Sequence, residues 1–275
     1  MTCRVAATLP KAMKDMQKIL SHVRSAVDKY RMIEPGDRIA VGVSGGKDSL
    51  TMLCALAQMR HFYPVPYEIV AIQIDMGFHL LDGRDDVENT HDGIRRLCEE
   101  IDVPYVLEKT EIAKIIFDAR EESNPCSLCA KMRRGALHKA AVAAGCNKLA
   151  LGHHFDDAAE TMMLNLFFEG RIGCFSPVTH LSRREIDVIR PMIHTEEKMI
   201  KSFAYKNALP VEESTCPADG NTQRAAMREY LKSFDKEHHY GLYRRLVGSL
   251  ERAGIDGWKA SEKEPHTAND EETDT

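Results

Sequence analysis

A turn between a strand and a helix, at residues 44–49, limits the possible folds of this chain more than any other feature. It reads Ser-Gly-Gly-Lys-Asp-Ser, follows the apolar segment 38–43 and precedes a helical pattern. The two glycines let the backbone bend without a Cβ clash, so that its N–H groups can face an anion. The helix N-terminus, the Lys47 ammonium and two serine hydroxyls add further attraction for negative charge. The spacing is shorter than in Walker-type phosphate loops, and the combination favours an anion-binding turn over an ordinary tight turn.

Short apolar strands alternate with helical patterns along most of the chain. We expect a helix over residues 11–33, strands near residues 38–43, 67–74, 105–107, 149–151 and 188–191, and intervening helices near residues 48–60, 84–101, 111–120, 129–144 and up to about 169. This alternation predicts an α/β fold, a Rossmann-like, doubly wound, mostly parallel sheet of about five strands with an N-terminal helix and a C-terminal helical segment. Such sheets bind ligands at the carboxyl ends of their strands. Residues 44–49, 75–77 and 152–157 all fall at such ends.

The composition is ordinary for a soluble globular protein of 275 residues. No uncharged apolar run approaches ~20 residues and no N-terminal signal peptide is evident, so we expect a cytoplasmic protein. The formal net charge is −5, and residues 261–275 carry six acidic residues against one lysine. The rest of the chain is therefore neutral overall, with basic clusters at residues 131–134 and 183–184. Such clusters can bind a folded RNA, although a solvated loop explains the second cluster equally well.

Three of the eight cysteines form a candidate metal or cluster site. Disulfides are rare in a reducing compartment, where a Cys-x-x-Cys pattern is more typical of metal or redox chemistry. Cys126 and Cys129 form such a pair, and Cys216 lies in a polar turn. The pair is compatible with a redox couple, half of a zinc site or part of an iron–sulfur cluster. Three thiolates without a fourth would leave one iron of a cluster open to an exogenous ligand, such as sulfur. We expect packing roles for Cys54, Cys98, Cys146 and Cys174.

Taken together, these motifs resemble the tRNA 2-thiocytidine synthetase family of the PP-loop ATP pyrophosphatase superfamily. The matching motifs, in the family's order, are residues 44–49, Cys126 to Cys129 with Arg133, Arg134 and Gly135, residues 151–157, residues 164–168 with Gly170, residues 189–191 and residues 221–224. They span about residues 38–232. The combination is far more specific than any single motif.

The resemblance implies an ATP-dependent tRNA sulfurtransferase. Such an enzyme uses ATP and Mg²⁺ to adenylate the C2 oxygen of cytidine 32 in the tRNA anticodon loop, and a sulfur carried on a [4Fe–4S] cluster then displaces AMP. Cys126, Cys129 and Cys216 would hold the cluster. Well-known members have a Pro-Cys-x-x-Cys stretch at the third ligand, where this chain has a single cysteine. The resemblance also implies a sulfur donor, either a cysteine-desulfurase persulfide or sulfide, and a homodimer.

Residue roles follow from the resemblance and from charge. The nucleotide-binding residues would be Ser44, Gly45, Gly46, Lys47, Asp48, Ser49 and Gly152, and the catalytic residues would be Asp48, Arg133 and Asp156. Lys47 would stabilise charge on the departing pyrophosphate. Asp48 and Asp156 could hold Mg²⁺, which prefers one or two carboxylates plus phosphates, or could instead cap their helices. Arg133 could stabilise the adenylated intermediate, and one of the histidines at 153–154 could orient its loop or simply pack.

Four segments are expected: an N-terminal helical segment at 1–34, the PP-loop ATP-binding and catalytic domain with the iron–sulfur site at 35–232, a C-terminal helical segment at 233–260 and a disordered acidic tail at 261–275. Other functions stay open. A related thiolase that acts on a uridine usually carries additional Cys-x-x-Cys zinc fingers, which this chain lacks. A lysidine-synthetase-like enzyme would not need the cysteines. A nucleotide-binding, cluster-containing sensor without turnover would not need the lysine and aspartates.

Overall fold

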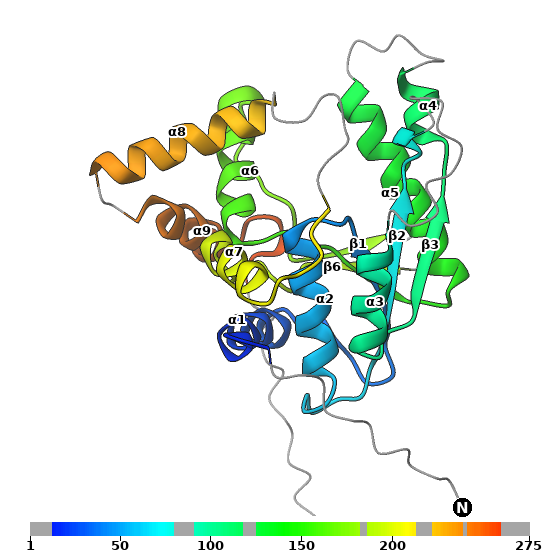
Figure 1. The fold of residues 1–275 in the computed structure, drawn as a ribbon. Helices are drawn as coiled ribbons and strands as arrows, with labels where there is room; N and C mark the ends of the chain where they lie inside the picture. The colour runs from blue at the N-terminus through cyan, green and yellow to red at the C-terminus, as the bar shows by residue number, and fades with distance from the viewer. Residues whose placement is uncertain are drawn as a thin grey trace, which may run out of the picture.

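A six-stranded sheet lies at the centre of the computed structural model, which describes residues 13–79, 91–117, 125–181, 186–212, 222–238 and 241–259. The strands follow the order β3-β2-β1-β4-β6-β5 (Figure 1). Their bounds are β1 Arg38–Val43, β2 Glu68–Asp75, β3 Tyr105–Lys109, β4 Lys148–Ala150, β5 Val178–Leu181 and β6 Ile186–Ile189. Among these strands, neighbours pair in parallel except β5 and β6, which are antiparallel. The predicted α/β fold with a mostly parallel sheet is confirmed.

Strand β5 is the strand that the sequence did not predict. It has four residues at the edge of the sheet, and all of them are half-buried or exposed. An edge strand of this kind needs no continuous apolar run, so its sequence resembles a loop. The sheet therefore has six strands where about five were expected.

Helices connect the strands and extend the chain beyond them. Their bounds are α1 Met16–Lys29, α2 Lys47–Met59, α3 Asp92–Glu100, α4 Ile112–Phe117, α5 Pro125–Ala143, α6 Phe155–Phe168, α7 Glu197–Lys206, α8 Gln223–His238 and α9 Leu242–Ala253, followed by the short 3₁₀ helix η2 Ile255–Gly257. Helix α5 begins four residues earlier than expected, because proline suits the first position of a helix. The Cys-x-x-Cys pair consequently lies inside α5, in its first turns.

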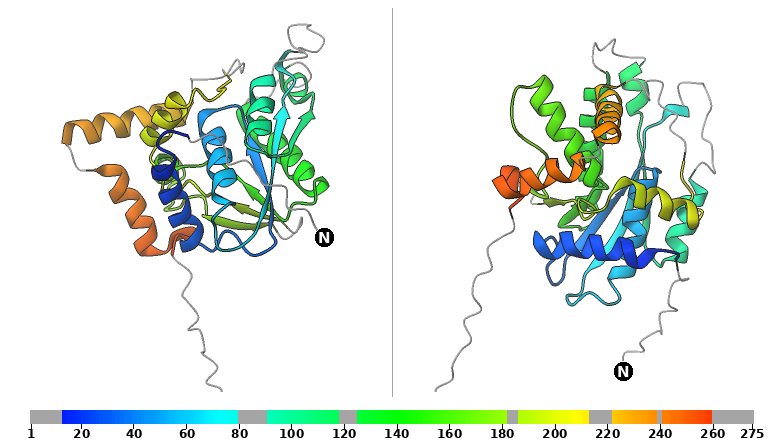
Figure 2. Two further views of the ribbon diagram at one scale, coloured as in Figure 1. Left: turned by 60° about the horizontal axis from the view of Figure 1, so that its bottom comes forward. Right: turned by 90° about the vertical axis from the view of Figure 1, so that its left-hand side faces the viewer.

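The two faces of the sheet bury separate apolar clusters. Alternate residues of β1 point to opposite faces, so that Ile39 and Val41 join a cluster with α1, α2 and α7, whereas Ala40 joins a cluster with α5. Helices α2 and α5 thus cover opposite faces of the sheet (Figures 1 and 2). The order of strands reverses between β1 and β4, which is where parallel sheets of this kind bind ligands. The turn at residues 44–49 follows β1 and lies at this point.

The C-terminal helices share the main core with the N-terminal helix. Trp258 is fully buried, and its carbonyl oxygen accepts a hydrogen bond from the Tyr30 hydroxyl at 3.0 Å. Helix α8 spans the expected boundary between residues 232 and 233, and it packs on α6 beside the sheet (Figure 1). The four-segment division stays a prediction, and its acidic tail falls outside the described residues. None of the described helices is both long and apolar enough to span a membrane.

Candidate active site

The turn at residues 44–49 has a backbone conformation that requires glycine at position 45. Gly45 has a φ of +81°, and a Cβ placed on it would lie 2.6 Å from the Glu212 Oε2 atom. The Glu212 N–H donates to the Gly45 carbonyl oxygen at 3.0 Å. The Ser49 hydroxyl donates to the Gly46 carbonyl oxygen at 3.0 Å and accepts from the Ser44 N–H at 3.1 Å. Hydrogen bonds to Glu212 and within the turn therefore fix the turn at the start of α2.

Gly152 allows the loop after β4 to approach this turn. A Cβ at Gly152 would lie 3.2 Å from the Ser49 backbone nitrogen and 3.3 Å from the Asp48 carbonyl carbon. Such contacts are tighter than most Cβ atoms tolerate, so a larger residue would push the loop away. Glycine at this position brings the start of α6, with its acidic residues, next to the start of α2.

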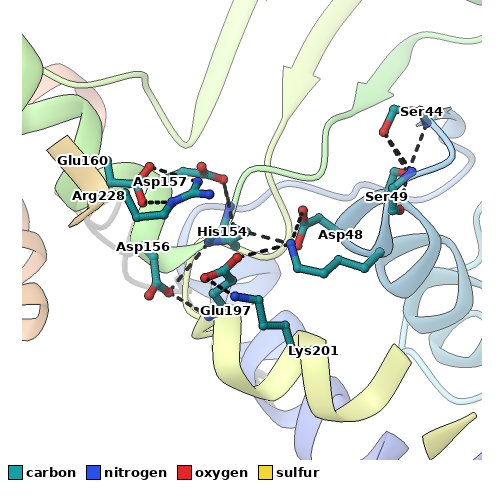
Figure 3. A network of polar contacts seen from close by, with 12 residues as sticks. Ser44, Asp48, Ser49, His154, Asp156, Asp157, Glu160, Glu197, Lys201 and Arg228 are labelled. Carbon is teal, nitrogen blue, oxygen red and sulfur yellow. Dashed lines mark hydrogen bonds and ion pairs between the residues drawn. The ribbon is translucent and has the colours of Figure 1, made fainter. Parts of the chain in front are cut away.

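Lys47 lies between two carboxylates. Its Nζ atom is 3.0 Å from Asp48 Oδ2 and 3.2 Å from Glu197 Oε1. The Lys201 Nζ atom lies 3.0 Å from the other carboxylate oxygen of Glu197 (Figure 3). Burial opposes the charged form of Lys47, but Asp48 and Glu197 outweigh it and raise the lysine pKa. Burial also opposes ionisation of Glu197, yet Lys201 and Lys47 lower its pKa to about 2. Lys47 and Glu197 are therefore both charged at neutral pH.

His154 is buried among the side chains of three aspartates. Its Nε2 atom lies 3.4 Å from Asp157 Oδ2 and 3.8 Å from Asp48 Oδ1, and its Nδ1 atom lies 3.7 Å from Asp156 Oδ2 (Figure 3). Asp157 also accepts a hydrogen bond from the His154 N–H at 3.0 Å, which closes the first turn of α6. The His153 ring instead packs against the Phe175 ring, with 4.9 Å between the ring centroids, and burial lowers the pKa of His153 to about 4. His154 is thus the histidine that faces the charged site.

Asp48 and Asp156 differ in how their oxygens are used. Asp156 Oδ2 accepts a hydrogen bond from the Glu197 N–H at 2.7 Å, so this carboxylate caps α7 rather than its own helix. Burial raises the pKa of Asp156. Asp48 Oδ1 is buried and accepts no hydrogen bond among the described residues. A buried carboxylate oxygen without a donor is a fitting ligand for a cation, and Mg²⁺ prefers such oxygens.

Several charged residues of the site were not identified from the sequence. Glu197 and Lys201 belong to α7, for which the sequence analysis named no site residue. Glu160 is fully buried on α6, and its Oε1 atom lies 2.6 Å from the Arg228 Nε atom of α8 (Figure 3). Glu212 also accepts from His91 at 2.8 Å. Sequence alone gives no signal for these pairs, because their partners come from distant segments. An isolated charge in an apolar helical pattern, as at Glu160, is the one clue.

The cysteine pair stands apart from this network of charges. Cys126 is exposed and Cys129 is half-buried, at positions i and i+3 of α5, and Arg133 is exposed one turn later. Neither cysteine fills the core, whereas the four cysteines expected to pack are buried, as predicted: Cys54, Cys98, Cys146 and Cys174. Cys216 lies outside the described residues, and Glu212 beside Gly45 is the last described residue before it. Two soft thiolates one helical turn apart, outside the core, fit part of a metal or cluster site.

Comparison with known proteins places this arrangement in a family. The PP-loop domain family matches residues 13–233. A tRNA-cytidine(32) 2-sulfurtransferase from Geobacter metallireducens is 41% identical over 228 residues, which cover 82% of this chain and 86% of the relative. A protein of the same name from Geotalea daltonii is 42% identical over 246 residues, which cover 87% of this chain and 94% of that relative.

One solved structure agrees with the fold over most of the chain. The U34-tRNA thiolase NcsA from Methanococcus maripaludis, solved with its [4Fe–4S] cluster, superposes with a TM-score of 0.66 over 92% of this chain and 87% of that one, at 23% identity. Similarity at this level of identity supports the α/β architecture alone. The identity to the curated relatives and the extent of the PP-loop match go further: this chain belongs to the PP-loop family and, within it, to the tRNA-cytidine(32) 2-sulfurtransferases.

Proposed function

We propose that the chain catalyses the ATP-dependent replacement of the C2 oxygen of cytidine 32 in tRNA by sulfur. The observation that carries this proposal is the sequence identity of at least 40% to tRNA-cytidine(32) 2-sulfurtransferases over most of the chain. The site supports it, because an anion-binding turn and a cysteine pair outside the core belong to one fold. A carbonyl oxygen is a poor leaving group. The reaction therefore uses ATP to adenylate the oxygen, which then departs as part of AMP.

The nucleotide end supplies groups for the first step. The N–H groups of Gly45 and Gly46 and the Lys47 ammonium would bind and stabilise the pyrophosphate as it leaves. Asp48 and Asp156 would hold Mg²⁺ together with phosphate oxygens, and the orphan Asp48 Oδ1 supports that role. His154 would keep these carboxylates in place.

The cysteine end supplies groups for the second step. Cys126, Cys129 and Cys216 would hold a [4Fe–4S] cluster, which with three protein ligands offers one open iron for sulfur. Arg133 is exposed on the same helix one turn after Cys129, and its guanidinium would stabilise the negative charge of the adenylated cytidine as AMP leaves. The sulfur would come from a cysteine-desulfurase persulfide or from sulfide, in the cytoplasm.

We also propose a homodimer. Large apolar side chains are exposed near the C-terminal end of α6 and on α8: Leu166, Phe167, Phe168, Ile172 and Tyr230. Apolar patches of this kind are typical of protein interfaces. Their burial between two copies of the chain would remove them from water.

The function is tested by incubating the anaerobic protein with ATP, Mg²⁺, sulfide and a tRNA transcript, followed by nuclease digestion and mass spectrometry. We expect 2-thiocytidine at position 32 together with AMP. A transcript with uridine at position 32 is the control and should remain unmodified. Sulfur on a uridine would favour the related thiolase, and ATP binding without AMP release would favour a sensor without turnover. Either result would refute the proposal.

A further inference from the structure

Helix α5 carries more net positive charge than any other described helix. Its 19 residues include Lys131, Arg133, Arg134 and Lys139 and contain no aspartate or glutamate. The whole chain has the opposite balance, with 42 acidic residues against 37 lysines and arginines. A solvated helix in such a chain normally mixes both signs of charge, as α1 and α8 do. The composition of α5 therefore indicates a face that meets negative charge.

The α5 cations also lack acidic partners within the described part of the chain. Lys131, Arg133 and Arg134 are exposed, and the Arg134 Nε atom donates to the Ala130 carbonyl oxygen of its own helix at 3.2 Å. Three acidic residues of the adjoining sequence, Asp118, Glu121 and Glu122, fall outside the described residues.

Exposed cations on α1 behave differently. Lys18 pairs with Asp15 at 3.4 Å, and Arg24 pairs with Asp28 at 3.3 Å. The contrast shows that the lack of acidic partners for the α5 cations among the described residues is not a general property of exposed cations in this fold.

The position of α5 brings these cations to the reactive edge of the sheet. Leu137, Ala140 and Ala141 bury the C-terminal half of α5 against the strands. Cys126 and Arg133 continue the same side of the helix at helical spacing but are exposed, because the first turns of α5 extend past β1 (Figure 1). Lys131 and Arg134 flank that side within three turns of the cysteine pair.

We infer that the N-terminal half of α5 binds the phosphate backbone of the tRNA substrate through Lys131 and Arg134. This inference rests on the proposed function, which supplies RNA as the partner. Unpaired lysines and arginines on a helix are complementary to closely spaced phosphates, and contacts of this kind position a nucleic acid without reading its sequence. Binding there would hold the anticodon loop beside the cysteines, while Arg133 stays available to the reacting base.

The test compares two double variants of the full-length protein. K131Q/R134Q removes both proposed phosphate contacts, and K18Q/R24Q removes one lysine and one arginine from α1, which lies far from α5 in Figure 1. Dissociation constants for an unmodified tRNA transcript are measured from low to high salt, together with ATP binding and thermal unfolding.

We expect K131Q/R134Q to weaken tRNA binding roughly tenfold at 0.1 M salt. The slope of log K against log salt should fall in magnitude by about 1–2, because each lost phosphate contact removes a little under one released counterion. ATP binding and turnover at saturating tRNA should stay at the wild-type level, and K18Q/R24Q should match the wild type throughout. Equal slopes for the wild type and K131Q/R134Q would overturn the inference and leave the proposed function intact.

Two further outcomes would also count against the inference. Unchanged tRNA binding with thiolation lost only when a cysteine desulfurase supplies the sulfur would assign α5 to an acidic protein partner instead. A wild-type protein that binds no tRNA at all would refute the proposed function and the inference together.

Discussion

The nucleotide end and the cysteine end of the site differ in how their charged and reactive groups are satisfied. At the nucleotide end, Lys47 lies between Asp48 and Glu197, and the buried Glu160 receives Arg228. At the cysteine end, Cys126 and Arg133 are exposed on a helix that has no acidic residue of its own. The first end is organised by contacts within the chain, whereas the described residues leave Cys126 and Arg133 of the second end exposed.

This difference fits the two steps of the proposed reaction. Stabilising a departing pyrophosphate requires dipoles and charges that are already in place, because reorganisation during the reaction would raise the barrier. Receiving a tRNA loop and a sulfur requires groups that stay open until their partners arrive. The following predictions change one end at a time.

The largest effect is expected for Cys126→Ala. Loss of one of three proposed cluster ligands should reduce thiolation to background, because sulfur could no longer be presented at the site. ATP binding should stay within about twofold of the wild type, since the charges around Lys47 are untouched. The measurements are 2-thiocytidine content of the tRNA and calorimetric ATP binding. Cys146→Ala is the control at a buried cysteine and should retain thiolation. Loss of ATP binding as well in Cys126→Ala would mean that the cysteine is structural.

The next effect is on stability at the nucleotide end. Arg228→Ala should lower the free energy of unfolding by about 3 kcal/mol, because it leaves the Glu160 carboxylate buried with only the more distant Arg224, at 3.6 Å. Urea unfolding measures this change. The control is Arg171→Ala, an exposed partner of Glu169, which should cost less than about 1 kcal/mol. Similar losses in the two variants would contradict the role given to the buried pair.

A glycine-to-alanine substitution should have a different effect at each end of the site, because Gly45, unlike Gly135, has a backbone conformation that strains alanine. Gly45→Ala places a Cβ at a φ of +81° and 2.6 Å from Glu212. The left-handed conformation costs roughly 1–2 kcal/mol for alanine, so we expect ATP to bind about tenfold more weakly. At Gly135 of α5 an added Cβ would meet no atom within 4 Å among the described residues outside its own helix, and Gly135→Ala should retain ATP binding and stabilise the helix by about 0.5–1 kcal/mol. Unchanged ATP binding in Gly45→Ala would show that the turn is not the nucleotide site.

The smallest effect concerns the pH dependence of stability. The pKa of Glu197 falls from its ordinary 4.5 to about 2 in the folded protein. Ionised Glu197 therefore stabilises the fold above about pH 4.5, and this contribution disappears as the pH falls towards 2. The difference in unfolding free energy between the wild type and Glu197→Gln should be constant from about pH 5 to 7 and shrink below that range. A difference that grows on acidification would contradict the assigned ion pairs.

The parts of the site that the sequence predicted are short, local motifs. The turn at residues 44–49, the loop starting at Gly152 and the pair of cysteines each consist of neighbours in the chain, and their residue types alone indicate anion or metal chemistry. The alternation of strands and helices placed the turn and the Gly152 loop at the carboxyl ends of parallel strands, and the structure bears this out. The roles assigned to the individual residues stay predictions.

Long-range pairs could not be predicted in the same way. His91 and Glu212 meet across 121 positions, and Glu160 and Arg228 across 68. One sequence gives no information on which of many acidic residues will meet which cation. The capping of α7 by Asp156 was missed for the same reason, because the sequence analysis considered Asp156 only as a cap of its own helix, α6. Strand β5 was missed because an edge strand needs little apolar sequence.

The contrast between the two ends is tested most directly by quantifying iron, acid-labile sulfide and zinc in protein purified without oxygen, for the wild type, Cys126→Ala and Cys216→Ala. The account predicts about four irons per chain with a similar amount of sulfide in the wild type, and loss of both in each variant. Zinc without sulfide in the wild type, or iron retained after removal of Cys216, would contradict a three-cysteine cluster at the open end of the site.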